Sequence, residues 1–270
     1  MTQIDKSRFE WIGSDSARRE GISRPSTTFW KDAIGRLMKN KVAVVCFFII
    51  VLLILSCIIV PFFSPFESRE QHLGEVNKGF MTVCTDSRYE GQHHVHYFGT
   101  DNLGRDLFLR AFEGGRVSLM IAFAAVFVNL IVGLIYGGIS GYIGGAVDTI
   151  MMRIVEIVNG IPYLIVVILL MMVLPKGIFT MVVAYGITGW TGMARLVRGQ
   201  VLQLKSQEYI VAAEAMGAKS SRIIAKHLIP NALSVIIINV TLAIPSAIFT
   251  EAFLSYIGLG VPVPQPSWGV

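Results

Sequence analysis

The chain has 270 residues, of which 53% are apolar and 15% are charged, and its formal net charge is +5. Soluble domains average about 25% charged residues, so this composition excludes soluble globular, disordered and collagen-like proteins and indicates a membrane protein. Excess lysine and arginine is typical of cytoplasmic loops, so we expect membrane lipid, and no nucleic acid, as a partner. The three cysteines form no CxxC pair and no metal-ligand spacing, which predicts neither a disulfide framework nor a cysteine-based metal centre.

Residues 1–41 are largely polar and are predicted to form a cytoplasmic N-terminal segment. The first apolar run begins at Val42, which is too far from the N-terminus for a secretory signal peptide. This run, residues 42–63, carries no charge, and about 20 apolar residues suffice for a helix to cross a bilayer. We therefore expect it to be the first transmembrane helix.

Residues 64–116 are predicted to form an extracytoplasmic loop, which is long enough to make a small cap. The loop contains an H-H-x-H cluster formed by His93, His94 and His96. Histidines bind transition metals, but alternating loop residues seldom converge on one ion without further ligands. We therefore predict no metal site from this cluster.

Residues 117–270 are predicted to form the core of an all-α, polytopic transmembrane bundle. Four further spans are expected, at about 117–142, 157–174, 178–194 and 232–257. The first of these is rich in glycine in its second half, which lets neighbouring helices approach closely. Gly160 and Pro162 interrupt the next one. With the helix at 42–63, the sequence predicts five spans.

The distribution of lysine and arginine predicts the orientation of these spans. Nine such residues precede Val42, and six lie in the segment 195–230 between the last two spans. Basic residues concentrate in cytoplasmic segments, so we expect the N-terminus and this second segment in the cytoplasm. Five crossings then place Val270 on the outer side.

The cytoplasmic segment 195–230 is expected to begin with a short helix that ends at a glycine. Ser206 is the expected N-cap, and Glu208 favours the positive end of the helix dipole. Alanines follow, which favour a helix, and Gly217 suits the position just after its end.

A second short helix is expected over 222–229, capped by Ser220 or Ser221 and ended by Pro230. Several apolar residues of the two helices must be covered: Ile210, Ala213, Ile223, Ile224 and Leu228. They either pack against the ends of the protein's own spans or sit in a groove of a cytoplasmic partner. Both can hold at once, because a helix has opposite faces.

Three stretches in and next to this segment resemble the signature loop of ABC-importer permeases: G-W-T-G-M-A-R-L-V-R-G-Q, E-Y-I-V-A-A-E-A-M-G and H-L-I-P-N. The general form of that loop is E-A-A-x3-G-x9-I-x-L-P, and it docks onto the ATPase subunit. The matching residues are Ala212, Ala213, Gly217 and Pro230. The departures are Val211 at the acidic position and His227 and Ile229 at the later apolar positions. These departures resemble the peptide-importer branch.

Three more motifs resemble the same branch, in the same order along the chain. They are F-G-T-D-N-L-G-R-D with G-R-V-S, G-Y-I-G-G-A-V-D with M-R, and E-A-F-L-S-Y-I-G-L-G with P-S-W-G. The chain is identified as a member of the C-type membrane subunits of oligopeptide/dipeptide or nickel ABC importers, which are type I importer permeases. In these relatives the P-S-W-G motif precedes a sixth span, so we expect that the chain is truncated before it.

The resemblance implies that this chain is not an enzyme and forms half of a pathway for di- and oligopeptides in the bacterial cytoplasmic membrane. It has no G-x-x-x-x-G-K-[ST] loop, so we expect no cofactor in this chain, with ATP and magnesium on partner subunits. The implied partners are a second permease subunit, two cytoplasmic ATPases and an extracytoplasmic solute-binding protein. The predicted ATPase-docking residues are Glu208, Ala212, Ala213, Gly217, Arg222, His227 and Pro230.

Two groups of residues keep alternative interpretations. Glu251 is an acid within an apolar span, where it either stabilises helix packing through hydrogen bonds or lines the pathway. The charged residues of the G-T-D-N-L-G-R-D motif form either a structural network or a contact with the binding protein. They are Asp101, Arg105 and Asp106.

The sequence also bears on three functional classes other than a peptide-importer permease. A nickel or other small-solute importer has the same motifs. A secondary transporter or channel usually has charged or broken helices at the membrane midplane and an internal repeat, for which one acid near a span end is thin support. An intramembrane enzyme needs paired acids, a Ser/His pair or H-E-x-x-H within the spans, and none is present in the sequence.

Overall fold

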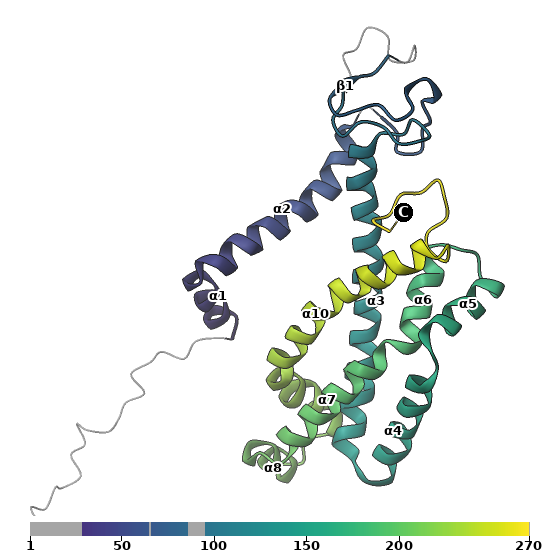
Figure 1. The fold of residues 1–270 in the computed structure, drawn as a ribbon. Coiled ribbons are helices and arrows are strands. Elements are labelled where there is room, and N and C mark those ends of the chain that lie inside the picture. Colours follow the sequence, from purple (N-terminus) through teal and green to yellow (C-terminus); the bar gives the residue numbers. More distant parts are fainter. Residues whose placement is uncertain (1–28, 65, 86–94, 270) are drawn as a thin grey trace, which may run out of the picture. The chain divides into compact units, whose positions relative to one another are not determined.

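The computed structural model describes residues 29–269 except for residue 65 and residues 86–94 (Figure 1). His93 and His94 of the histidine cluster lie outside the described residues. The chain divides into two compact units, Met1–Leu52 and Leu53–Val270, and each is described by itself.

The first unit contains α1 (Phe29–Lys39) and the first part of α2 (Lys41–Phe63). The helix α2 has 23 residues, with Lys41 at its start and apolar side chains along most of its length. At 1.5 Å per residue it is about 35 Å long, which suffices to cross a bilayer. It covers the predicted first span at 42–63.

The second unit is mainly helical. Its helices are α3 (Leu107–Ile143), α4 (Gly145–Gly160), α5 (Tyr163–Val173), α6 (Ile178–Thr188), α7 (Trp190–Lys205), α8 (Glu208–Ala215), α9 (Ser220–Ile223), the π-helical turn η5 (Ile224–Leu228) and α10 (Ile229–Tyr256). Between α2 and α3 lies a small cap, defined here as residues 64–106. The described part of the cap contains a 3-10 turn (Leu73–Glu75) and the strands β1 (Thr82–Val83) and β2 (Val95–His96), which pair antiparallel.

The helix α3 begins ten residues before the predicted span, at Leu107 instead of Val117. Asp106 is its N-cap, and the carboxylate of Asp106 accepts a hydrogen bond from the backbone N–H of Leu109 at 2.7 Å. The residues expected to close the outer loop therefore form the first turns of the helix. With 37 residues, α3 is about 55 Å long, which exceeds the hydrocarbon thickness of a bilayer.

Glycines at every fourth position of α3 allow it to pack closely against α7. A Cβ atom on Gly137 would collide with the backbone oxygen of Ala194, and one on Gly141 would lie 2.9 Å from the backbone oxygen of Arg198. Gly133 faces Met193 in the same way. The structure thus confirms that the glycines predicted in this span permit close helix contact.

By length and composition, three helices of the described chain are able to cross a membrane, and a fourth span results if α4 and α5 count as one. These two helices are bent by 78° at the break that contains Pro162. The predicted span at 178–194 is divided between α6 and α7 by a break at Gly189. The sequence predicted five spans, whereas the described helices offer three candidate spans, or four with the bent pair, because the predicted span at 178–194 is divided into two shorter helices.

Candidate functional site

The first helix of the predicted docking segment is present as α8, but its cap differs from the prediction. Ser206 ends α7, and its hydroxyl donates to the backbone oxygen of Gln203 at 3.1 Å. Gln207 has extended backbone angles and is the N-cap of α8, without a side-chain hydrogen bond. The prediction of Ser206 as the cap was wrong because α7 continues to Lys205 and uses Ser206 as its own end. Glu208 lies in the first turn, as expected.

Gly217 forms the corner after α8, as predicted. Its φ angle is +79°, in the left-handed region that favours glycine. The backbone N–H of Gly217 donates to Glu214 at 2.9 Å, and that of Ala218 donates to Ala213 at 3.1 Å. This pair of bonds is the Schellman motif, which satisfies the last carbonyl groups of a helix.

The second helix is not a separate element, which corrects the prediction for 222–229. The helix starts at Ser220, with Lys219 as its N-cap, and runs through η5 into α10 as one helix of 37 residues that ends at Tyr256. Pro230 lies in the first turn of α10 and does not end the helix. The π-helical turn η5 ends two residues before this proline, whose ring would clash with the preceding turn of a regular α-helix. The residues of α9 are therefore continuous with a helix that is long and apolar enough to cross a membrane.

The buried face of this segment packs against the protein's own helices. Ile210, Ile223 and Leu228 are fully buried in a cluster with Val197 and Val201 of α7. Ala213 is 5% exposed. The expectation that these apolar residues pack against the ends of the spans is confirmed.

The opposite face of α8 is exposed, and the two alanines of the signature motif lie on different faces. Ala212 is exposed whereas Ala213 is buried. Val211 and Tyr209 are exposed at 54% and 43%, and Met216, just after the helix, at 82%. We call this set, Tyr209, Val211, Ala212 and Met216, the α8 outer face. Large exposed apolar side chains around a small residue form a surface that suits a partner protein.

The other predicted docking residues, except Ala213, are exposed or half-buried. Glu208, Gly217, Arg222 and Pro230 are exposed, and His227 is half-buried. The structure thus brings most of the predicted docking residues to the surface and places Ala213 inside.

The C-terminal end of α3 is tied to α7 and α8 by polar contacts. The hydroxyl of Tyr142 donates to the carboxylate of Glu214 at 3.0 Å. The ammonium group of Lys205 donates to the backbone oxygen of Tyr142 at 2.5 Å and lies 5.2 Å from the centre of its ring. These contacts connect α8 to the end of α3.

A second tie joins α3, α4 and α7. The guanidinium group of Arg198 binds both carboxylate oxygens of Asp148, at 2.5 and 2.6 Å. The hydroxyl of Ser140 donates to the same carboxylate at 2.5 Å. A bidentate pair fixes geometry as well as charge, so three helices are held in register here.

A cavity of about 510 Å³ lies among α3, α5, α6, α7 and α10, next to the break at Gly189. Its polar lining residues, as far as the structure describes them, are all uncharged: Asn129, Tyr163, Tyr185, Thr188, Asn239, Ser246 and Thr250. The side-chain oxygen of Asn129 is buried and has no hydrogen-bond partner among the described residues. It therefore offers a free acceptor at the cavity.

The sequence reasoning did not find this cavity. Polar residues inside apolar spans were the available signal, because buried amides in a membrane are costly unless they serve a partner or a ligand. Asn129 and Asn239 both interrupt apolar runs. Which face each amide occupies depends on helix packing, however, and one sequence does not show it.

Glu251 is buried at a different place and does not line the cavity. Its carboxylate accepts hydrogen bonds from Ser118 of α3 at 2.7 Å and from Ser255 at 2.8 Å. The Ser118 hydroxyl in turn accepts the backbone N–H of Trp268 at 3.1 Å. Of the two interpretations of Glu251, the structure therefore agrees with helix packing.

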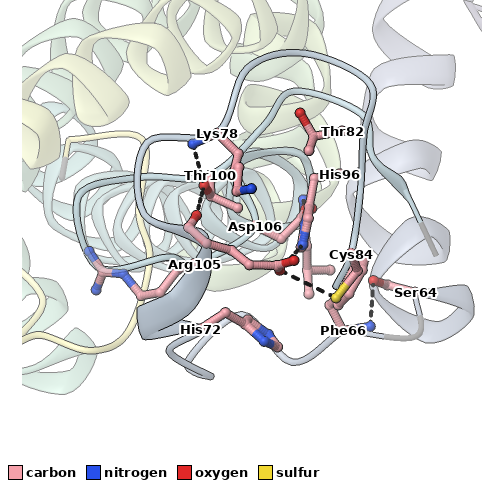
Figure 2. A network of polar contacts seen from close by, with 12 residues as sticks. Ser64, Phe66, His72, Lys78, Thr82, Cys84, His96, Thr100, Arg105 and Asp106 are labelled. Atoms are coloured by element: carbon pink, nitrogen blue, oxygen red, sulfur yellow. Dashed lines mark hydrogen bonds and ion pairs between the residues drawn. The ribbon is translucent and has the colours of Figure 1, made fainter. Parts of the chain in front are cut away.

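The charged residues of the cap form an internal network (Figure 2). The guanidinium of Arg105 donates to Asp101 at 2.7 Å, and the other oxygen of Asp101 accepts the backbone N–H groups of Leu103 and Arg105. Burial raises the pKa of Asp101, but the hydrogen bonds and the charge of Arg105 lower it by more than burial raises it. The pKa of Asp101 therefore lies below its ordinary value. Asp106 caps α3 and binds His96 at 2.7 Å. Each of these groups has a structural partner inside the cap.

Comparison with known proteins places this chain in a class of membrane transport proteins. Residues 130–270 match the family model of the binding-protein-dependent transport system inner membrane component. Residues 28–79 match that of the N-terminal TM domain of oligopeptide transport permease C.

Individual relatives agree with these matches. The chain is 49% identical over 269 residues to the oligopeptide transport system permease protein OppC of Bacillus subtilis, covering 100% of this chain and 84% of that protein. It is 47% identical to the dipeptide transport system permease protein DppC of the same organism, covering 93% and 75%. For OppC of Escherichia coli (strain K12) the identity is 42%, covering 98% and 84%. The chain therefore belongs to the binding-protein-dependent transport inner-membrane components, as a multi-pass C-type oligopeptide/dipeptide permease.

A solved structure shares the fold. It is an inward-facing conformation of the MetNI methionine ABC transporter, with a TM-score of 0.51 and 21% identity, covering 56% of this chain and 76% of that one. At this identity the likeness concerns the fold alone, and it agrees with the predicted type I importer permease.

Proposed function

We propose that this chain is one of two permease subunits of an ATP-driven importer of di- and oligopeptides. Two ATPases on the cytoplasmic side supply ATP and magnesium chemistry, and a solute-binding protein delivers peptide from the outer side. The proposal includes a cytoplasmic N-terminus, as the distribution of basic residues predicts. The names of the relatives, which are oligopeptide and dipeptide transport permeases, support the substrate class.

The division of α8 into two faces carries the proposal for ATPase coupling. Its inner face is packed into the helical core, and its outer face exposes Tyr209, Val211 and Met216 around Ala212. An ATPase docked on this face pushes a short, well-anchored helix instead of a flexible loop. Because α9 continues into α10, the push reaches a membrane span without an intervening joint.

The uncharged cavity supports a role in peptide passage. Peptides differ in side-chain charge but share backbone N–H and C=O groups, which amides and hydroxyls bind. Asn129 has a free side-chain oxygen there, and Thr188 and Asn239 add further polar groups. A lining without fixed charge is compatible with cargo of either sign.

The experiment compares two substitutions at Ala212 in the reconstituted transporter. Ala212→Arg places a long charged side chain on the proposed contact, and we expect it to abolish peptide-stimulated ATP hydrolysis and to release the ATPases during purification. Since Ala212 is exposed, the permease itself remains folded. Ala212→Ser is the matched control and retains both properties. Normal co-purification and stimulation in the Arg variant would contradict the coupling proposal.

The substrate class is tested separately in the same proteoliposomes. With the cognate binding protein, peptides stimulate ATP hydrolysis and accumulate in the vesicle lumen, whereas nickel ions do not. Stimulation by nickel and not by peptides would overturn the assignment in favour of the metal importer. Transport without the ATPases would instead indicate a secondary transporter or channel.

A further inference from the structure

The interior of the cap brings together three side chains of the kinds that bind transition metals. They are His72, Glu75 and Cys84, which are 1%, 2% and 8% exposed. One ligand atom from each lies within 4.8 Å of the ligand atoms of the other two. His72 and Cys84 are labelled in Figure 2. We propose that these three residues form a binding site for a divalent transition-metal ion of the zinc class.

The backbone of the cap holds the three residues in place. His72 immediately precedes the 3-10 turn, Glu75 ends it, and Cys84 follows β1. Gly104 packs directly on the backbone of His72, where a Cβ atom would collide with the His72 carbonyl oxygen. The cap thus positions these side chains by main-chain contacts that do not depend on an ion.

The carboxylate of Glu75 is oriented toward Cys84. One oxygen accepts the backbone N–H and the hydroxyl of Thr85, and the hydroxyl bond is 2.9 Å long. The other oxygen lies 3.3 Å from the sulfur of Cys84. The Thr85 bonds therefore leave the second oxygen on the side where the sulfur lies.

His96 supports the site without belonging to it. Its Nε2 lies 3.1 Å from the Glu75 oxygen that faces Cys84, and its Nδ1 lies 2.7 Å from Asp106. The ring stacks on Phe66, with 4.3 Å between ring centres. Carboxylate–histidine pairs of this kind commonly orient the residues that ligate a metal. The histidine cluster of the sequence thus contributes one residue here, in a supporting role.

The ligand chemistry selects the class of ion. Imidazole nitrogen, thiolate sulfur and carboxylate oxygen together suit zinc, whereas magnesium and calcium prefer oxygen ligands alone. Zinc bonds of about 2.3 Å to sulfur and about 2.0 Å to oxygen at tetrahedral angles separate the two atoms by about 3.5 Å. The 3.3 Å between Cys84 and Glu75 is close to this separation. On binding, the thiol of Cys84 loses its proton to water and the ion takes its place between sulfur and carboxylate.

The site is tested by cobalt titration of the complete purified transporter after treatment with a chelator. Cobalt(II) bound to a thiolate gives a charge-transfer absorption band in the near ultraviolet. We expect this band in the wild type at one cobalt per permease chain, its loss in Cys84→Ser, and competition by zinc. Glu75→Gln is expected to weaken cobalt binding at least about tenfold.

The controls separate this site from other metal-binding groups. Cys57→Ser removes a buried thiol in α2 and is expected to leave the band unchanged. A variant with His93→Ala and His94→Ala also retains it. The proposal is overturned if the wild type shows no thiolate band, if Cys84→Ser retains it, or if the histidine variant loses it. Should Cys84→Ser fail to fold, absence of the band from the wild type still overturns the proposal, and so does unchanged cobalt affinity in Glu75→Gln.

Discussion

The two ends of α3 are held by different forces. At its start, the cap uses buried charges and directional hydrogen bonds, with Asp106 bound both to His96 and to the first turn of the helix. At its other end, α3 is packed closely against α7 through glycines, α8 rests on an apolar cluster, and polar ties join α3 to α4, α7 and α8. Buried polar groups within one stretch of chain thus hold the cap, whereas close helix packing and polar ties between several helices hold the other end. The comparison indicates that the cap end is fixed locally and that a displacement of α8 is expected to reach several helices together.

The largest expected effect follows from filling the contact between α3 and α7. Gly137→Leu introduces a side chain where even a Cβ atom collides with the backbone of Ala194. Overpacking of this kind costs about 3 kcal/mol, and rigid backbone atoms are unable to yield. We expect a strong loss of monodisperse protein and a lower thermal midpoint in detergent.

The matched control for this change is Gly199→Leu. Gly199 lies in α7, and a Cβ atom there meets nothing within 4 Å. Its thermal midpoint should equal or exceed that of the wild type, since leucine favours a helix over glycine. Equal losses in both variants would show that the close contact is unimportant.

The next effect concerns the polar end. Asp106→Ala removes the N-cap of α3 and leaves the buried His96 without its carboxylate partner. Breaking such a buried pair costs about 3 kcal/mol. We expect faster hydrogen exchange throughout the cap and in the first turns of α3, while exchange in α8 stays unchanged. Faster exchange at both ends would contradict the separation drawn here.

A smaller effect is expected at the corner after α8. Gly217→Val places a β-branched residue at a φ angle of +79°, which costs about 1–2 kcal/mol. Gly217→Asn is the control, because asparagine tolerates this conformation better. The valine variant should lose more peptide-stimulated ATP hydrolysis than the asparagine variant, with both inserted in the membrane. Identical activities would show that the corner is not needed for coupling.

The smallest effect is a pH dependence in the cap. The pKa of Asp101 is held below its ordinary value, so its ionised form stabilises the fold. This contribution is fully present above the ordinary pKa of an aspartate and is lost as the pH falls through the lowered value. Asp101→Asn should therefore lower the stability of the cap by about 1–2 kcal/mol near neutral pH. In this variant the stability of the cap should also fall less steeply as the pH is lowered. Both effects are measured as the protease resistance of the cap at a series of pH values. The same dependence on acidic pH in the variant and the wild type would contradict the stabilising role of ionised Asp101.

The features that sequence predicted well are local. Long apolar runs predicted α2 and α10, and the glycine after an alanine-rich stretch predicted the corner at Gly217. Each depends on residues that are neighbours in the chain, where periodicity and capping rules apply directly.

The features that sequence did not predict depend on the exact course of the backbone and on how separate elements pack together. The helix continues through Pro230 with a π-helical turn just before it, and no pattern of neighbouring residues in the sequence predicts such a turn. The cavity combines residues of five helices, and the proposed metal site combines Glu75 with a cysteine nine residues away. Such convergence follows from packing, so neither appears as a motif.

We propose that the α8 outer face binds the ATPase, and photo-crosslinking is a direct test of this contact. Benzoylphenylalanine is placed at Tyr209 and Met216 on this face and, as a control, at Tyr256, which is 86% exposed at the far end of α10. We predict that irradiation of the intact transporter links positions 209 and 216 to an ATPase subunit and leaves position 256 unlinked to it. Crosslinks to the ATPase from position 256, or none from 209 and 216 in an active complex, would contradict the account.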